Sequence, residues 1–207
     1  MPRASAEQRT EAVLDRAEIF YLVHFESLCR DNGDWEGLVG SYVPASPVRT
    51  TWFDGPIEDF AVALKAKTDA GDVARHRVAP AKLHQRGERA ICESPANVSE
   101  RLTLDGVQVD VTAHMRIHTR LVLTDFGWRL NSFEAIYERD SIQPVNPTET
   151  LPLDWDKLNA LRPSYRFQGF CDASRGYEIT PDLLGDDSPD PLEAFYLNER
   201  HWVATGE

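Results

Sequence analysis

The feature that most constrains the fold is a two-residue alternation that begins at Val107. Apolar residues recur at or near every second position, at Val107, Val109, Val111, Ala113, Met115, Ile117, Leu121 and Leu123. Polar residues lie between them, at His114, Arg116, His118 and Arg120. Because successive side chains of a β-strand point to opposite faces of a sheet, we predict one long strand with an apolar and a polar face.

The polar row contains the pair His114 and His118, which could be taken for metal ligands. Residues four apart on a strand are about 13 Å from each other, at about 3.3 Å per residue. That separation is too large for one zinc ion. We therefore predict no metal site and interpret the row as a polar or interface face of the sheet.

Turn signals divide the region around this strand into hairpins. They stand at Arg86-Gly87, Asp105-Gly106 and Phe126-Gly127, and glycine after a polar or bulky residue is typical of tight connections between strands. We predict an antiparallel meander of about four long strands that ends near Asp140.

Helical patterns dominate the chain before the meander. Ser5 and Gln8 have the spacing of a capping box, and Asn32-Gly33 can end the long helix that begins there. The stripe predicted to face inward on this helix consists of Ala17, Tyr21, His24, Leu28 and Asp31. Two further helices are expected at residues 35–42 and 57–70, with a short strand at 48–56 between them.

Helices followed by a meander predict an α+β fold, with three N-terminal helices packed on a curved, mostly antiparallel sheet. The other face of the sheet is left for solvent or for a dimer partner. Pro144, Pro147 and Pro152 indicate a linker of restricted flexibility. We therefore predict a domain at residues 1–145 and a C-terminal extension at 146–207 that packs on the body or on a neighbouring subunit.

The acidic balance of the chain limits its partners. Its formal net charge is −12, whereas binding to a phosphate backbone relies on clustered Lys and Arg, so nucleic acid is not expected as a partner. The sequence contains no apolar run near the ~20 residues of a membrane span and no apolar signal-peptide core. We predict a cytoplasmic protein without a membrane partner, in which the three widely spaced cysteines are reduced.

The order of several short motifs resembles one known family. D-x-x-DWEGL, F-D-G-P, R-H-R-V-x-P and W-R-L-x-x-F-x-A-I-Y follow one another over about residues 10–145. This order is similar to that of the SnoaL-like branch of the nuclear transport factor 2-like superfamily. The resemblance implies a cone-shaped α+β barrel around a pocket. The superfamily includes scytalone dehydratase, ketosteroid isomerase, polyketide cyclases, a hexachlorocyclohexane dehydrochlorinase and members without catalysis, so the fold alone does not give the function.

The same resemblance implies a catalytic pair. In its dehydratase-like and dehydrochlorinase-like members, an acid at the end of the first helix orients a histidine at the start of the first long strand. Asp31 and His76 match those positions. A carboxylate beside an imidazole fixes its tautomer and stabilises the cation formed when it accepts a proton. Two other interpretations stay open, with Asp31 as a cap of the helix end and His76 as a strand residue bonded to the backbone.

The remaining site residues are expected around the pocket. The hydroxyl of Tyr137 could donate to a substrate oxygen, and the walls are predicted from Tyr42, Trp52, Met115 and Phe133, with Tyr21 and His24 as further candidates. Ordinary core packing is the alternative for each of them. Phe133 stands where the dehydrochlorinase has an arginine that meets the leaving group, which argues against loss of halide.

These features predict a cofactor-independent lyase or isomerase that transfers protons on a small hydrophobic, aromatic or polycyclic molecule. Dehydration, isomerisation, cyclisation and retro-aldol cleavage share the first step. No nucleotide-binding or serine-hydrolase motif is present, and no cofactor is expected. The alternative is a non-catalytic ligand-binding or accessory subunit, similar to the small subunit of a ring-hydroxylating oxygenase. By analogy with the family, a homodimer or higher homo-oligomer is expected.

Overall fold

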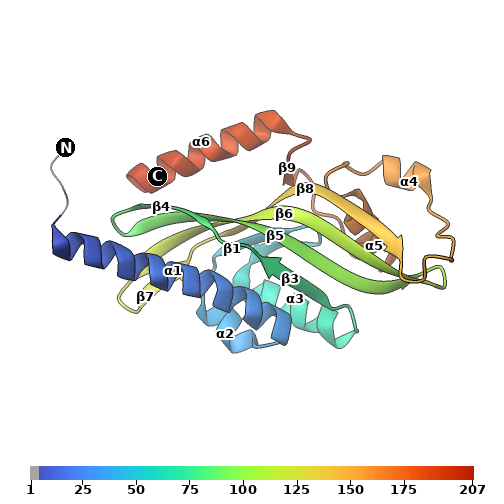
Figure 1. Ribbon diagram of the computed structural model, residues 1–207, viewed down its shortest axis with the longest axis horizontal. Coiled ribbons are helices and arrows are strands. Elements are labelled where there is room, and N and C mark those ends of the chain that lie inside the picture. The colour runs from blue at the N-terminus through green and yellow to red at the C-terminus, as the bar shows by residue number, and fades with distance from the viewer. Residues whose placement is uncertain (1–4) are drawn as a thin grey trace.

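A long, curved sheet forms the centre of the molecule, with helices on both of its faces (Figure 1). The computed structural model describes residues 5–207. The helices are α1 (Ala6–Asn32), α2 (Trp35–Gly40), α3 (Ile57–Asp69), α4 (Trp155–Asn159), α5 (Arg166–Ser174) and α6 (Pro189–Thr205). The strands are β1 (Pro47–Thr50), β2 (Phe53–Pro56), β3 (Ala74–Val78), β4 (Lys82–Arg86), β5 (Arg89–Leu104), β6 (Val107–Thr124), β7 (Gly127–Leu130), β8 (Phe133–Pro144) and β9 (Leu184–Gly185).

The predicted meander is confirmed. Strands β5 and β6 form one long hairpin, paired without interruption from Arg89 opposite Val122 to Leu104 opposite Val107. The sheet has the order β2-β1-β8-β6-β5-β3, and β4, β7 and β9 join at its margins. Most neighbours are antiparallel, whereas β8 pairs in parallel with β1 and with β9. The α+β cone expected from the sequence is therefore the observed fold.

A bulge in β8 changes which of its side chains face the concave side. The pairing of β8 with β6 shifts between His114 and Met115, so Met115 lies opposite Tyr137 and His114 lies opposite Arg139. One extra residue in a strand reverses the alternation beyond it. As a result Tyr137 and Asp140 both point to the concave face, and Asp140 Oδ2 accepts a hydrogen bond of 2.8 Å from the backbone N–H of Gln168.

Helix α1 begins and ends as its sequence indicates. Ser5 and Gln8 form the capping box, and Gly33 adopts the left-handed conformation with a φ of 75° at the other end. The predicted inward stripe is wrong, however, because Tyr21, His24 and Leu28 are exposed. The buried face of α1 is instead Ile19, Leu22, Val23, Glu26, Ser27, Cys29 and Arg30.

Two charged residues explain why this face was not recognised. Glu26 and Arg30 are buried and form an ion pair of 3.1 Å, one turn apart on the helix. Unpaired charges are almost never buried, so a periodicity count assigns them to the surface. Here each compensates the other, and the helix turns a charged pair toward the sheet.

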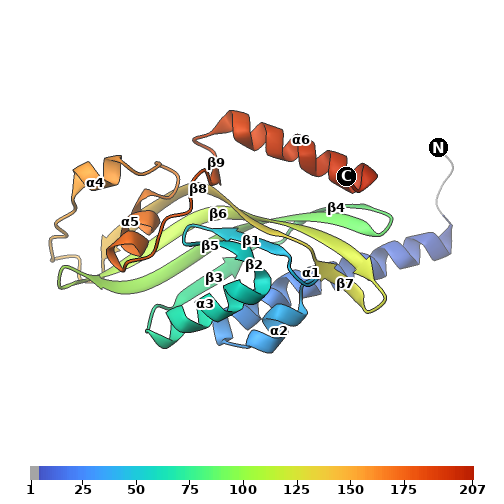
Figure 2. The same ribbon diagram turned by 180° about the vertical axis from the view of Figure 1, so that it is seen from behind.

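Helices α1, α2 and α3 cover the concave face (Figure 2). The core between them and the sheet contains Ile19, Leu38, Ile57, Phe60, Met115, Phe133 and Tyr137, among others. The strand predicted at 48–56 is a hairpin of β1 and β2, with Thr51 and Trp52 at its turn. In residues 5–207 no helix combines the length and the apolar character that a membrane span requires.

The C-terminal extension packs on both faces of the sheet. Helix α5 lies on the concave side, where Cys171, Phe167 and Phe170 join a second apolar cluster with Val109 and Val111. Helix α6 lies across the convex side (Figure 1). Its Glu199 binds Arg120 with a shortest distance of 2.6 Å. The convex face is thus partly covered by the chain's own C-terminal extension.

Candidate active site

Asp31 and His76 lie in direct contact at the junction of α1 and β3. Oδ1 of Asp31 is 2.5 Å from Nδ1 of His76, and Oδ2 accepts the backbone N–H of His76 at 2.8 Å. The two side chains are 6% and 11% exposed. One carboxylate therefore holds both the backbone and the ring of the histidine, and the ring nitrogen Nε2 is left for another partner.

The local sequence produces this contact. Asp31 belongs to the last turn of α1, and Arg75 of β3 donates a hydrogen bond of 2.9 Å to the backbone carbonyl of Asp31. Burial alternates along β3, so His76 turns inward with Ala74 and Val78 while Arg75 is exposed. The end of one helix and the start of one strand are thereby tied together on the inner side of the cone.

Burial and charge set the protonation states of the pair. Burial raises the pKa of Asp31, but its hydrogen bonds with His76 outweigh this effect and leave the pKa below its usual value. Burial and the nearby guanidinium of Arg30 lower the pKa of His76 to about 4, against the opposing effect of Asp31. The pair is thus an ionised carboxylate and a neutral imidazole at pH 7, with Nδ1–H donating to Asp31.

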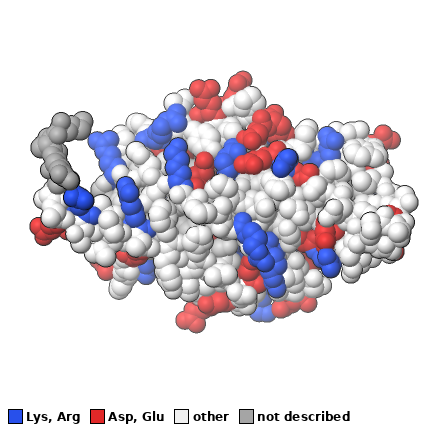
Figure 3. Space-filling view, in the orientation of Figure 1, with Lys and Arg blue, Asp and Glu red and all other residues white. Residues whose placement is uncertain are grey.

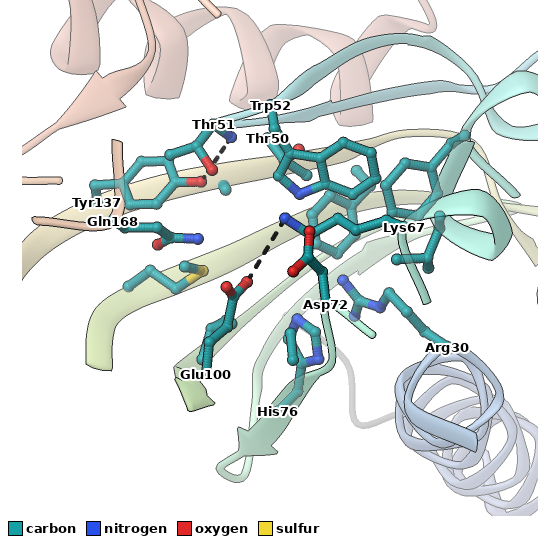
Figure 4. A pocket seen from close by; sticks show the side chains of 17 residues that line it. Arg30, Thr50, Thr51, Trp52, Lys67, Asp72, His76, Glu100, Tyr137 and Gln168 are labelled. Atoms are coloured by element: carbon teal, nitrogen blue, oxygen red, sulfur yellow. Dashed lines mark hydrogen bonds and ion pairs between the residues drawn. The ribbon is translucent and has the colours of Figure 1, made fainter. Parts of the chain in front are cut away.

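A small cavity adjoins the histidine on the concave side of the sheet. Its volume is about 50 Å³, room for a few water molecules. Its walls include Arg30, Trp52, Phe60, Lys67, Asp72, His76, Glu100, Met115, Phe133, Tyr137 and Gln168. Figure 4 shows four charged or titratable side chains that converge on this space. They are His76 of β3, Glu100 of β5, Lys67 of α3 and Asp72, which follows α3. We call this space the inner cavity.

Four of the predicted site residues line the inner cavity beside His76. Trp52, Met115, Phe133 and Tyr137 all contribute to it. The hydroxyl oxygen of Tyr137 accepts a hydrogen bond of 3.0 Å from the backbone N–H of Thr51, and burial raises its pKa. A neutral phenol that accepts from the backbone keeps its own hydrogen to donate to a ligand oxygen.

Three predicted wall residues lie elsewhere. Tyr21 is 67% exposed and stacks on Phe25 on the outside of α1, and His24 is exposed on the same helix. Tyr42 is buried, but its hydroxyl donates to Glu26 at 3.0 Å, and it is not part of the cavity wall. Tyr21 and His24 were misplaced because the wrong face of α1 was assigned to the interior.

A buried charge network on the cavity wall was not predicted. Nζ of Lys67 is 3.0 Å from Asp172 and 3.9 Å from Glu100. Arg175 binds the same two carboxylates at 2.8 and 2.6 Å. Lys67, Asp172 and Glu100 are 2%, 0% and 7% exposed. Arg175 also binds a third carboxylate, that of Asp72, at 3.2 Å. We call Lys67, Glu100, Asp172 and Arg175 the Lys67 network.

One feature of the sequence indicates that Lys67 is buried. The inward positions of α3 are Ile57, Phe60, Ala61 and Leu64, and Lys67 continues the same stripe by one turn. A lysine on the apolar stripe of a helix indicates a buried partner. Its partner Asp172 comes from α5, more than one hundred residues later, and nothing local in the sequence connects the two residues.

A second cation reaches the cavity from α1. The guanidinium of Arg30 stacks over the ring of Phe133 at 4.7 Å. Its charge is compensated by Glu26, whose pKa is raised by burial although Arg30 and Tyr42 oppose that effect. Phe133 of β8 is therefore covered by an arginine from α1.

A family comparison covers the part of the chain that holds this site. The profile of the SnoaL-like domain matches residues 11–134, more than half of the chain and the part that contains both Asp31 and His76. The chain belongs to the SnoaL-like domain family. The matched range ends at the start of β8, so the bulge, Tyr137 and the C-terminal extension lie beyond it.

Two curated relatives of this SnoaL-like protein come from Fusarium vanettenii. A PEP2-like protein is 28% identical over an alignment of 201 residues that covers 92% of this chain and 86% of that protein. Pea pathogenicity protein 2 is 28% identical over an alignment of 177 residues that covers 83% of this chain and 76% of that protein. Both similarities extend well past the matched domain and into the C-terminal extension.

A solved structure supports the fold. The type 2 hexachlorocyclohexane dehydrochlorinase (LinA) superposes with a TM-score of 0.57 over 70% of this chain and 97% of that chain, at 10% identity. At this identity the likeness shows the cone fold alone.

Proposed function

We propose that this protein is a cofactor-independent lyase or isomerase in which His76 removes a proton from carbon. The observation that carries the proposal is the contact of 2.5 Å between Nδ1 of His76 and Asp31 beside the inner cavity. A neutral imidazole whose Nδ1–H is fixed by a carboxylate presents Nε2 as a proton acceptor. Asp31 then stabilises the imidazolium that forms.

The first step moves one proton and one electron pair. Nε2 of His76 takes the proton from a carbon next to a carbonyl group, and the electrons of that C–H bond move toward the carbonyl oxygen. The cavity offers groups that can stabilise this oxygen, namely the ammonium of Lys67 and the hydroxyl of Tyr137. In a dehydration, the imidazolium next gives its proton to the departing hydroxyl, which leaves as water. In an isomerisation, the proton returns to another carbon.

The size and walls of the inner cavity limit the substrate. Pockets for drug-sized ligands usually hold about 300–1,000 Å³, whereas this cavity has about 50 Å³. Aromatic and apolar walls of Trp52, Met115 and Phe133 favour a flat hydrophobic molecule. We infer a small substrate, and a substrate with a ring requires Trp52 to move, because a cavity that holds one benzene ring has a volume of about 150 Å³.

The second candidate is a non-catalytic ligand-binding protein, and the same small volume favours it. Trp52 packs on Phe60 with ring centroids 5.5 Å apart, and Arg30 covers Phe133, so side chains occupy much of the space between the helices and the sheet. In that case Asp31 and His76 tie α1 to β3 and do no chemistry. The two candidates differ in one respect, because only the enzyme exchanges protons on its ligand.

Deuterium uptake from D₂O distinguishes them. We expect the protein to catalyse loss of the α-proton NMR signal from small aryl alkyl ketones and β-hydroxy ketones, with alkene formation from the latter. The rate should exceed that of the same buffer with heat-denatured protein. A ligand that binds and shifts the protein resonances, yet exchanges no faster than in buffer, would support the non-catalytic candidate instead.

A further inference from the structure

We propose that the convex face of the sheet carries a second binding site, for a small single-ring carboxylate. The site is a cavity of about 250 Å³ beneath α6, on strands β4, β5 and β6. Its walls are Lys82, His84, Ile91, Glu93, His118, Tyr196 and Arg200, none of which lines the inner cavity. We call it the outer cavity, and its existence is independent of the proposed function of the inner one.

The register of the sheet builds the floor of the outer cavity. Lys82 pairs with Glu93, and Glu93 pairs with His118, which places the three side chains in one row across β4, β5 and β6. Ile91 lies opposite His84 in the adjacent row. His118 lies on the polar face of β6, the strand whose alternation the sequence shows from Val107 onward.

Long polar side chains hold α6 above this floor. Arg120 binds Glu199 of α6 at 2.6 Å, and Nε of Arg116 donates to the hydroxyl of Tyr196 at 3.3 Å. Tyr196 in turn donates to Glu93 at 2.6 Å. Because extended polar side chains connect α6 to the sheet, the helix does not pack directly on the strands. A cavity remains between these side chains.

A buried imidazole stands at the wall of this space with an unfilled hydrogen-bonding position. His118 is 2% exposed, and its Nδ1 has no hydrogen-bond partner among residues 5–207. The nearest carboxylate, Glu199, is 3.7 Å away. Burial lowers the pKa of His118 against the opposing effects of Glu199 and Glu93, so the ring is neutral at pH 7. A buried polar group without a partner is destabilising, so Nδ1 of His118 is an unsatisfied group on a residue of the cavity wall.

The charges around the outer cavity favour an anion. Lys82 and Arg200 are exposed at its margin, and Glu93 is the one carboxylate among its wall residues, already bonded to Tyr196. Lys and Arg side chains gather on this side of the molecule, around β4, the end of α6 and the start of α1 (Figure 3). This local excess stands out on a chain of net charge −12, and such patches attract anions.

The size of the outer cavity and its apolar wall define the rest of the ligand. A volume of about 250 Å³ lies just below the range of about 300–1,000 Å³ for drug-sized ligands. Ile91 supplies an apolar wall, and the rings of His118 and Tyr196, 6.2 Å apart, supply aromatic edges. A single aromatic ring with one carboxylate matches these features, its carboxylate directed to Lys82 and Arg200.

Titration calorimetry with benzoate tests the proposal, with benzamide as an uncharged probe of the same shape. We expect benzoate to bind the wild-type protein and the His76→Ala variant equally. Binding should weaken at least tenfold in a Lys82→Glu, Arg200→Glu double variant, because both changes reverse exposed charges at the margin. Benzamide should bind at least tenfold more weakly than benzoate. The control is Lys65→Glu, a single charge reversal at an exposed site on α3, which should leave binding unchanged.

Three results would overturn the proposal. One is the absence of benzoate binding to the wild-type protein at millimolar concentration. Another is loss of binding in His76→Ala, which would place benzoate in the inner cavity. The third is equal affinity in the charge-reversal double variant and the Lys65→Glu control, which would show that Lys82 and Arg200 take no part.

Discussion

Replacing His76 by alanine is expected to lower the rate of α-proton exchange by about 10²- to 10⁴-fold, the usual contribution of a positioned general base. The reason is geometric, since His76 is the base that the contact with Asp31 orients beside the inner cavity. The rate is measured by NMR in D₂O on the compound that the wild-type protein exchanges fastest.

The matched control is His84→Ala. His84 lies on β4, the next strand along the chain, is exposed, and does not line the inner cavity. Its replacement should leave the exchange rate unchanged. Thermal unfolding of both variants checks that each is folded. Exchange that continues at the wild-type rate in a folded His76→Ala protein would remove His76 from the mechanism.

Replacing Lys67 by methionine is expected to have the largest effect on stability. Removing one partner of a buried ion pair costs about 3–5 kcal/mol, because the remaining charge stays buried and uncompensated. Asp172 is fully buried and Glu100 nearly so, and both depend on Lys67 and Arg175. Arg175 remains in the variant, so we expect a loss near the lower end, about 3 kcal/mol in the free energy of unfolding.

Lys65→Met is the matched control for this effect. Lys65 and Lys67 stand on the same helix, but Lys65 pairs with Asp69 at the surface, where the side chains are 52% and 64% exposed. Exposed pairs contribute about 0–1 kcal/mol. Urea unfolding of the two variants gives the comparison. Equal and small losses would show that the Lys67 network is not the junction between α3 and α5 that its burial implies.

The regular part of the fold followed from short-range patterns. The alternation after Val107 gave the central strand, and the capping residues Ser5 and Gly33 gave both ends of α1. Each of these signals is local, because it depends on side chains within a few residues of one another. The contact between Asp31 and His76 was expected through the family resemblance, and the structure brings the two side chains together.

The missed features are those that depend on distant parts of the chain. The inward face of α1 was misassigned because Glu26 and Arg30 compensate each other inside the protein. The Lys67 network joins α3 to α5, and Gln168 of α5 also lines the inner cavity. The cover over the convex face comes from α6. No periodicity in the sequence states which distant segment will supply a partner charge.

The most direct test of the proposed base is an NMR titration of the ring nitrogens of His76. At pH 7 we expect hydrogen on Nδ1, donated to Asp31, and none on Nε2. A free histidine takes its second proton near pH 6.5, whereas burial and Arg30 lower the pKa of His76 to about 4. The neutral ring is the base, so activity should persist on acidification to about pH 5 and be lost through about pH 4. A ring with hydrogen on Nε2, or one already protonated on both nitrogens at pH 7, would contradict the assignment of His76 as the base.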